Sequence, residues 1–166
     1  MKRSLRNLLL TLHVTTSVGF VGAIASFLSL AIAGAFHQDQ TIVRGAYVAM
    51  NVITNFVIVP LCFAALLTGV VQSLTTPWGL FRHYWVLVKL VLTLLSAAVL
   101  LLHTNPIEAM SQAAQAAPLE PEDFFGQRRQ LIIAAAGALL IGLGTIVLSI
   151  FKPAGLTAYG WRKRAQ

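Results

Sequence analysis

The chain has 166 residues, of which 57% are hydrophobic and 10% are charged, and its formal net charge at pH 7 is +7. Soluble domains carry roughly 25% charged residues, so this composition excludes a water-facing surface of the ordinary kind. The single cysteine, Cys62, excludes an internal disulfide and a cysteine-rich metal site. The basic residues lie mainly beside hydrophobic segments, where they orient membrane helices, so nucleic acid is not expected as a partner.

Four long apolar segments predict four membrane-spanning helices, over about 8–36, 46–74, 84–103 and 131–151. Each is long enough to cross about 30 Å of hydrocarbon at about 1.5 Å per residue. The first follows a basic flank as a secretory signal would, but it exceeds the roughly 7–15 apolar residues of such a signal, so we expect it to be retained. The segments predict one integral membrane domain, residues 1–166, with an all-α fold.

Pro60 lies near the middle of the second segment. A proline inside a helix removes one backbone hydrogen bond and clashes with the preceding turn. We therefore expect the second helix to bend there and to widen the interior of the bundle beside it.

Three connectors separate the predicted helices: 37–45, 75–83 and 104–130. The second contains the turn signal Thr-Pro-Trp-Gly. The third is the longest, and residues 107–117 within it can form a short surface helix that ends at Pro118.

Charged and aromatic residues predict the orientation in the membrane. One side holds Lys2, Arg3, Arg6, Arg82, Lys152, Arg162, Lys163 and Arg164, and the other holds Arg44, Arg128 and Arg129. The positive-inside rule then places both termini and the second connector in the cytoplasm. The residues of an interfacial aromatic belt on that side are Trp78, Tyr84, Trp85, Tyr159 and Trp161.

Lys89 is the most unusual residue of the apolar segments. It lies about five residues into the third segment, or roughly 7–8 Å below the membrane edge by helical rise. An ionisable side chain costs about 2.5–3.5 kcal/mol at full membrane depth, so Lys89 indicates a functional site. The alternative interpretation is structural, because a shallow lysine can extend its long stem to the interface.

His13 lies about five residues into the first segment, so His13 and Lys89 are predicted at nearly equal depth. The polar residues that continue the two faces at helical spacing are Thr16 and Ser17 beside His13, and Thr93, Ser96 and His103 beside Lys89. We expect both faces to point into the bundle, because lipid-facing positions rarely keep such residues. The alternative for His13 is a core histidine that is hydrogen-bonded to a neighbouring helix.

Further polar residues lie near the opposite membrane face. His37 and His103 end the first and third segments, and Asn51 and Asn55 share one face of the second. We interpret these as interfacial residues solvated by headgroups and expect both histidines to be dispensable for a cofactor; an outer metal or heme-edge site is the alternative. The apolar segments contain no acidic residue, which excludes a carboxylate proton relay.

An early histidine in the first helix, followed by Trp85-Val86-Leu87-Val88-Lys89-Leu90 at the start of the third, carries a resemblance. The chain resembles small bacterial inner-membrane proteins. More distantly, it is similar to the copper-resistance D proteins and the membrane-embedded, heme-containing protoporphyrinogen oxidases. In the oxidase family the matching histidine and lysine, here His13 and Lys89, are needed for heme binding and activity. The second connector and the long third loop depart from the oxidases, so the resemblance implies a tetrapyrrole pocket rather than a particular reaction.

We therefore expect a four-transmembrane-helix bundle that holds a b-type heme or related porphyrin and does redox-related work in a bacterial inner membrane. His13 is expected to bind the heme iron. Lys89 is expected to support the same site, as a second iron ligand or as the partner of a heme propionate. Two other classes stay open: a heme-free small carrier or copper-handling protein, and a non-catalytic accessory subunit of a membrane complex. A homo-oligomer and a partner in a membrane complex are both open as partners at this point.

Overall fold

The computed structural model describes residues 3–76, 79–119 and 123–164. The elements, in chain order, are α1 (Arg3–Phe36), α2 (Gln40–Ile53), the π-helical segment η1 (Thr54–Ile58), α3 (Val59–Thr75), α4 (Tyr84–Ala116), α5 (Phe125–Phe151) and α6 (Ala158–Arg164). Lys2 and Trp78, which contribute to the predicted orientation, lie outside the described residues.

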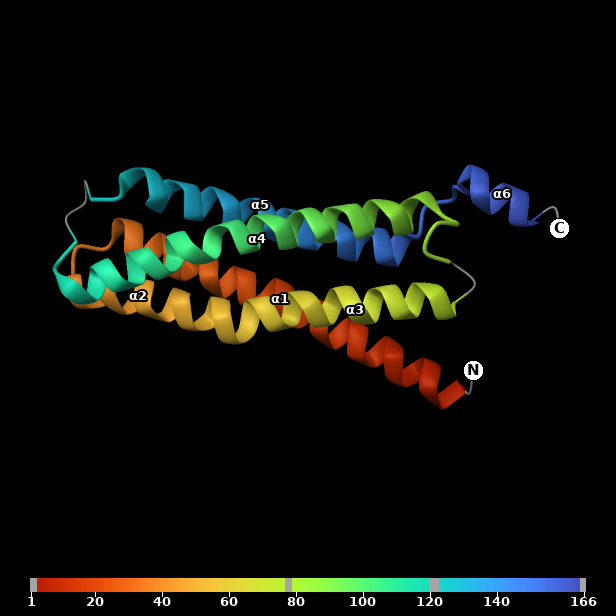
Figure 1. The fold of residues 1–166 in the computed structure, drawn as a ribbon, viewed down its shortest axis with the longest axis horizontal. Helices are drawn as coiled ribbons and strands as arrows, with labels where there is room; N and C mark the ends of the chain where they lie inside the picture. Colours follow the sequence, from red (N-terminus) through yellow and green to blue (C-terminus); the bar gives the residue numbers. More distant parts are fainter. Residues whose placement is uncertain (1–2, 77–78, 120–122, 165–166) are drawn as a thin grey trace.

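Four stretches are long and apolar enough to cross a membrane: α1, the continuous stretch Gln40–Thr75, α4 and α5. They confirm the predicted all-α fold with four membrane-spanning helices. Both ends of the chain lie at one end of the bundle (Figure 1). We call this the terminal end; it holds the start of α1, the connector between α3 and α4, and α6. The opposite hairpin end holds the connectors between α1 and α2 and between α4 and α5.

The helices are longer at the hairpin end than the apolar segments predicted. The second stretch begins at Gln40 rather than at 46, because Asp39 caps it by accepting a hydrogen bond from the Thr41 backbone N–H at 2.8 Å. This hydrogen bond from the Thr41 backbone also holds the pKa of the Asp39 carboxyl below its ordinary value. The α5 helix begins at Phe125 rather than at 131. Arg128 therefore lies in a helix, 5% exposed, with its guanidinium carbon 5.8 Å from the centre of the Tyr47 ring.

The largest correction concerns the third predicted helix, which does not end at 103. The α4 helix continues through Pro106 to Ala116, so the expected surface helix over 107–117 is the last part of α4. Ile107, Met110 and Ala114 lie on one face of this extension and are almost fully buried, and α4 packs against α2. Burial of this apolar face holds the chain in a helix beyond the apolar segment, although polar residues interrupt the sequence.

Pro60 follows a local change of helix type. The backbone N–H of Val59 donates to the carbonyl of Thr54, five residues earlier, so the turn before the proline is wider than an α-helical turn. A proline has no N–H to donate, and a widened turn accommodates its ring. The α-helix is thus interrupted in the turn directly before Pro60. The predicted bend of the helix at Pro60 stays a prediction.

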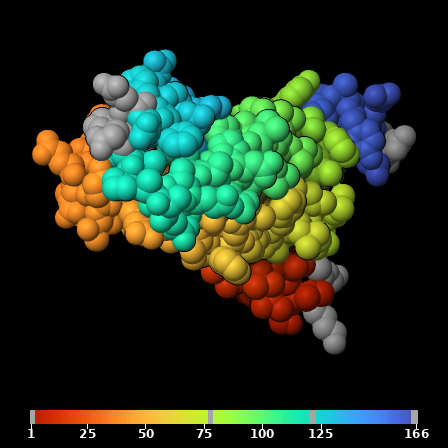
Figure 2. Space-filling model, turned by 60° about the vertical axis from the view of Figure 1, so that its left-hand side comes forward, coloured from red at the N-terminus to blue at the C-terminus, as the bar shows by residue number. Residues whose placement is uncertain are grey.

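The helices form a bundle in which α1 and α4 occupy diagonal positions. The α1 helix packs against α2, α3 and α5, and α4 packs against the same three helices from the other side (Figure 1). The buried residues of α1 begin only at Ala23, and the core is concentrated toward the hairpin end. The first half of α1 diverges from the other helices, as the projecting red segment in Figure 2 shows. The bundle is therefore tightly packed at the hairpin end and more open at the terminal end.

Each end of the bundle is also held by hydrogen bonds between connectors. At the hairpin end, the side-chain amide of Gln40 donates to the Leu119 carbonyl at 3.0 Å and accepts from the Leu119 N–H at 3.2 Å. At the terminal end, the Thr157 hydroxyl donates to the Phe81 carbonyl at 2.6 Å, and the Thr157 N–H donates to the Arg82 carbonyl at 3.0 Å. The segment before α6 is thus fastened to the connector between α3 and α4.

Gly160 tests this attachment, because a Cβ at position 160 would collide with the Arg82 carbonyl oxygen. We expect Gly160→Ala to separate α6 from the Phe81–Tyr84 segment. Hydrogen exchange of the Thr157 amide should become faster. The control is Gly137→Ala, where a Cβ meets nothing within 4 Å and the helix should gain about 0.5–1 kcal/mol. An unchanged exchange rate at Thr157 in Gly160→Ala would contradict the role of this contact.

Candidate functional site

His13 lies on the interior side of α1 and contacts α3. Its Nδ1 atom is 3.2 Å from the Thr68 hydroxyl. The ring fills the space above a glycine, since a Cβ at position 69 would lie 2.9 Å from the His13 Cε1 atom. Gly69 thus allows α1 and α3 to approach each other with the imidazole between them.

The hydrogen bonds around His13 favour one tautomer of the ring. The Thr68 hydroxyl lies 2.6 Å from the Ala64 carbonyl, which can only accept, so Thr68 uses its proton there. Thr68 then accepts from His13, and the hydrogen is assigned to Nδ1. This arrangement leaves the Nε2 lone pair for another partner.

Lys89 points from α4 toward α5. Its ammonium group donates a short hydrogen bond to the Ser149 hydroxyl, which in turn donates to the Thr145 carbonyl at 2.8 Å. The Lys89 Nζ atom also lies 5.8 Å from the centre of the Trp85 ring, within the range of a cation–π contact. These contacts hold Lys89 inside the bundle, so the structure does not show it extending to the interface.

Among the residues that the structure describes, no carboxylate contacts Lys89. The described acidic residues are Asp39 and Glu108, toward the hairpin end, and Asp123 in the connector between α4 and α5. Glu108 is 19 residues further along α4, or about 28 Å by helical rise. An intramembrane ammonium group usually pairs with an opposite charge. In the described part of the chain, Lys89 contacts a neutral hydroxyl and an aromatic ring instead.

The structure places His13 and Lys89 at the same level. A Cβ at Gly142 would lie 2.8 Å from Val21, which fixes a point of close contact between α1 and α5. From that contact, His13 lies eight residues along α1 and Ser149 seven residues along α5, toward the same end. Both distances are about 10–12 Å by helical rise. Because Lys89 binds Ser149, the predicted equal depth of His13 and Lys89 agrees with the packing.

Sequence reasoning missed the partners of these two residues. Thr68 and Ser149 are single hydroxyl residues in apolar helices, and such residues most often bond to their own backbone. Gln72, one turn after Thr68, has a buried side-chain oxygen with no hydrogen-bond partner within the described chain. It adds an unused acceptor at the terminal end of α3.

The residues expected at the outer membrane face do not gather into one site. His37 is exposed and accepts a hydrogen bond from the Asp39 N–H at 3.0 Å. Asn55 donates to the Asn51 side-chain oxygen at 2.8 Å, in an exposed pair. Across residues 3–76, 79–119 and 123–164, no three histidine, cysteine or acidic side chains form a group that would hold a metal ion.

The interpretation of His103 as a solvated residue at a helix end is wrong. It lies within α4, thirteen residues before Ala116. Its Nδ1 atom is 2.7 Å from the Val99 carbonyl, and its Nε2 atom is buried. The apolar segment ends at 103, but the helix and its buried face do not.

Comparison with known proteins gives no matching family model, no matching curated protein and no matching solved structure.

The Lys89–Ser149 hydrogen bond predicts how substitutions of these two residues change the free energy of unfolding. We expect Ser149→Ala to lower the free energy of unfolding in detergent micelles by about 1–3 kcal/mol, because the enclosed ammonium group loses its acceptor. Ser26→Ala is the control, since its exposed hydroxyl bonds only to its own helix. The double variant Lys89→Met with Ser149→Ala should regain most of the loss. Equal losses in the single and double variants would contradict an energetic coupling between these residues.

Proposed function

We propose that this membrane protein binds a b-type heme or a related porphyrin at His13 and Lys89 and uses it for redox-related work. The observation that carries the proposal is that a cation and an available imidazole nitrogen lie at one level of the bundle. Among the described residues, Lys89 is an intramembrane cation that donates to a neutral hydroxyl, and the His13 ring forms its protein hydrogen bond through Nδ1, which leaves the Nε2 lone pair for a ligand. A metal-bearing, anionic cofactor satisfies both.

His13 has the hydrogen bonding expected of an iron ligand. Metal-binding histidines commonly donate their second ring N–H to a protein oxygen, which fixes the tautomer and the ring orientation. Thr68 supplies that oxygen for His13. Neutral imidazole is in turn a common axial ligand of heme.

Lys89 fits the propionate interpretation better than that of a second iron ligand. Its amine donates to Ser149 and lies near the Trp85 ring, and both contacts suit an ammonium cation. A cation at this depth, near the terminal end, can pair with a carboxylate of a bound porphyrin.

The space for a porphyrin is not preformed. The interior cavity of the bundle has about 60 Å³, whereas cofactor sites are typically about 300–1,000 Å³. The donor set therefore fits the cofactor, but the volume of this cavity does not. In our proposal the cofactor is held at the terminal end, beside the half of α1 that has no buried residue among 3–22.

Heme supplies one-electron chemistry when bound. The chain supplies the imidazole of His13, the cation of Lys89 and the surrounding apolar helices, which exclude water from the group.

Visible absorption of the protein purified from heme-replete cells tests the proposal. We expect a Soret band that is lost in His13→Ala. Lys89→Met should mainly weaken cofactor retention if Lys89 pairs with a propionate, and should change the spin state of the iron if Lys89 is a ligand. No Soret band in the wild-type protein, or an unaltered spectrum in His13→Ala, would refute the site. The first result would favour the heme-free carrier or the accessory subunit.

His103→Ala is the matched control, because it removes another interior imidazole from the level of the small cavity. We expect the Soret band to persist in this variant. Loss of the cofactor in His103→Ala, with retention in His13→Ala, would move the iron site to His103.

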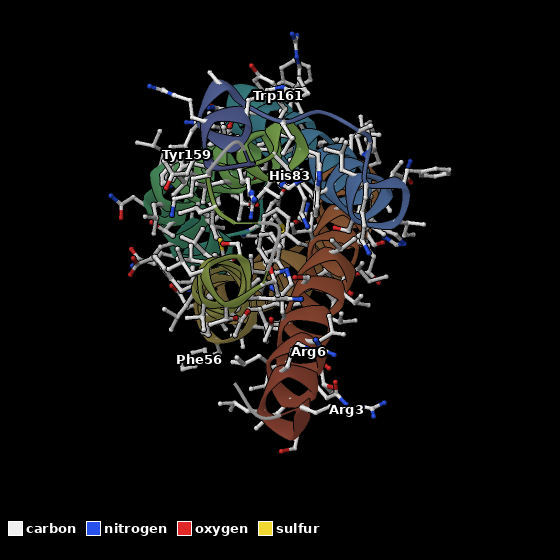
Figure 3. The ribbon with its side chains drawn as sticks, turned by 90° about the vertical axis from the view of Figure 1, so that its right-hand side faces the viewer. Arg3, Arg6, Phe56, His83, Tyr159 and Trp161 are labelled. Atoms are coloured by element: carbon white, nitrogen blue, oxygen red, sulfur yellow. The ribbon has the colours of Figure 1, made fainter. Side chains whose placement is uncertain are left out.

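We also propose that the terminal end faces the cytoplasm in a bacterial inner membrane. Figure 3 shows this end, with Arg3, Arg6, His83, Tyr159 and Trp161. Basic residues there outnumber those of the hairpin end, which supports the orientation.

Cysteine labelling tests the orientation. In a Cys62→Ala background, a membrane-impermeant thiol reagent added to intact spheroplasts should label Ala117→Cys at the hairpin end. It should label Tyr159→Cys only after lysis. Both positions are exposed, and Cys62, which is 1% exposed, is removed to avoid background. Labelling of Tyr159→Cys in intact spheroplasts would reverse the assignment.

A further inference from the structure

Two polar atoms in the bundle interior lack a hydrogen-bond partner within the described chain. Ser96, which is 8% exposed, has an unpartnered Oγ, and His103 has an unpartnered, buried Nε2. Both residues continue the face of α4 that begins at Lys89. A buried polar group that is left unbonded costs about 1–3 kcal/mol, so two of them on one face indicate a missing partner.

Ser96 and His103 line the same interior cavity. This cavity of about 60 Å³ is formed by α1, η1, α4 and α5. Apolar residues make up the rest of its wall, among them Phe20, Phe27, Ile58, Leu131 and Ala135. A buried water needs roughly 10–15 Å³ of such space and two to four polar partners. The cavity therefore has room for molecules the size of water, but not for an organic cofactor.

The protonation of the His103 ring determines which hydrogen-bonding partner the cavity can hold. A carbonyl can only accept, so the 2.7 Å contact with Val99 places a hydrogen on His103 Nδ1. In the neutral ring, Nε2 is then an acceptor and requires a donor. Side chains on a helix lean toward its N-terminus, so the imidazole leans toward Ser96, seven residues earlier. Ser96 adds a hydroxyl that both donates and accepts.

We propose that this cavity is a hydrated site in the membrane-spanning part of the bundle. One or two water molecules donate to His103 Nε2 and bond to Ser96 Oγ. The site is separate from the His13–Lys89 site and does not depend on a porphyrin. It lies at the junction of η1 with α1, α4 and α5, where the widened turn before Pro60 contributes Ile58 to the wall. Ser96 and His103 are the polar residues in the wall of this otherwise apolar cavity.

Solid-state NMR of the ¹⁵N-histidine-labelled chain in lipid vesicles tests the site. Magnetisation transfer from water should reach the His103 ring, as it should reach the exposed His37, and His103 Nε2 should have the chemical shift of a hydrogen-bonded acceptor. His103→Gln identifies the His103 signals by their loss. Ala135→Val, which fills part of the cavity, should remove the water transfer to His103 and leave its Nδ1–H signal in place. No water transfer to wild-type His103, while His37 shows it, would overturn the proposal.

Thermal unfolding in detergent gives a second measurement. If water bonds Ser96, Ser96→Ala should lower the midpoint, because the water loses a partner. If the cavity is dry, removal of an unbonded hydroxyl should raise the midpoint, and this result would also overturn the proposal. Ser29→Ala is the control, since its exposed hydroxyl bonds to the Ala25 carbonyl of its own helix at 3.0 Å.

Discussion

The membrane requires polar groups within the bundle to find partners inside the protein, and the other features of the structure depend on this requirement. Hydroxyl residues of the spanning helices meet it by donating to carbonyls of their own helix, as Thr16, Thr68 and Ser149 do. Such bonds satisfy the hydroxyl proton without involving another helix. Some buried polar atoms of the described chain are not satisfied in this way, among them the Ser96 hydroxyl and the His103 Nε2 atom.

The residues of the two proposed sites lie at two levels of the bundle with different packing. At the terminal end, His13 and Lys89 lie where the first half of α1 diverges from the bundle, so this level can change its packing without exposing a formed core. Further along, Ser96 and His103 lie beside the buried residues that join α1, α4 and α5. We therefore propose a large cofactor at the first level and water at the second. The difference arises from packing, because both levels offer an imidazole.

The sequence predicted the parts of the fold that follow from hydrophobicity. The four spanning helices and the equal depth of His13 and Lys89 could be derived, because apolar segments set the position of each helix in the membrane. Helix ends could not, because an apolar segment ends at the membrane surface, whereas a helix ends where its packing and capping end. The part of α4 after His103 is held by burial of Ile107 and Met110 against the neighbouring helices. That extension changes His103 from an interfacial residue into an interior one.

The partners of the site residues were beyond sequence reasoning for a related reason. Depth follows from counting along one helix, but a contact between helices requires their rotation and crossing to be known. Gly69 and Gly142 set these for α1, because each admits a side chain of α1 where a Cβ would collide. Once Val21 is seated against Gly142, helical rise brings His13 to the level of Ser149, and Lys89 reaches that level from α4 by its hydrogen bond. The two glycines therefore determine which polar residues lie at the same depth in the bundle, although they have no side chain that could bind a ligand.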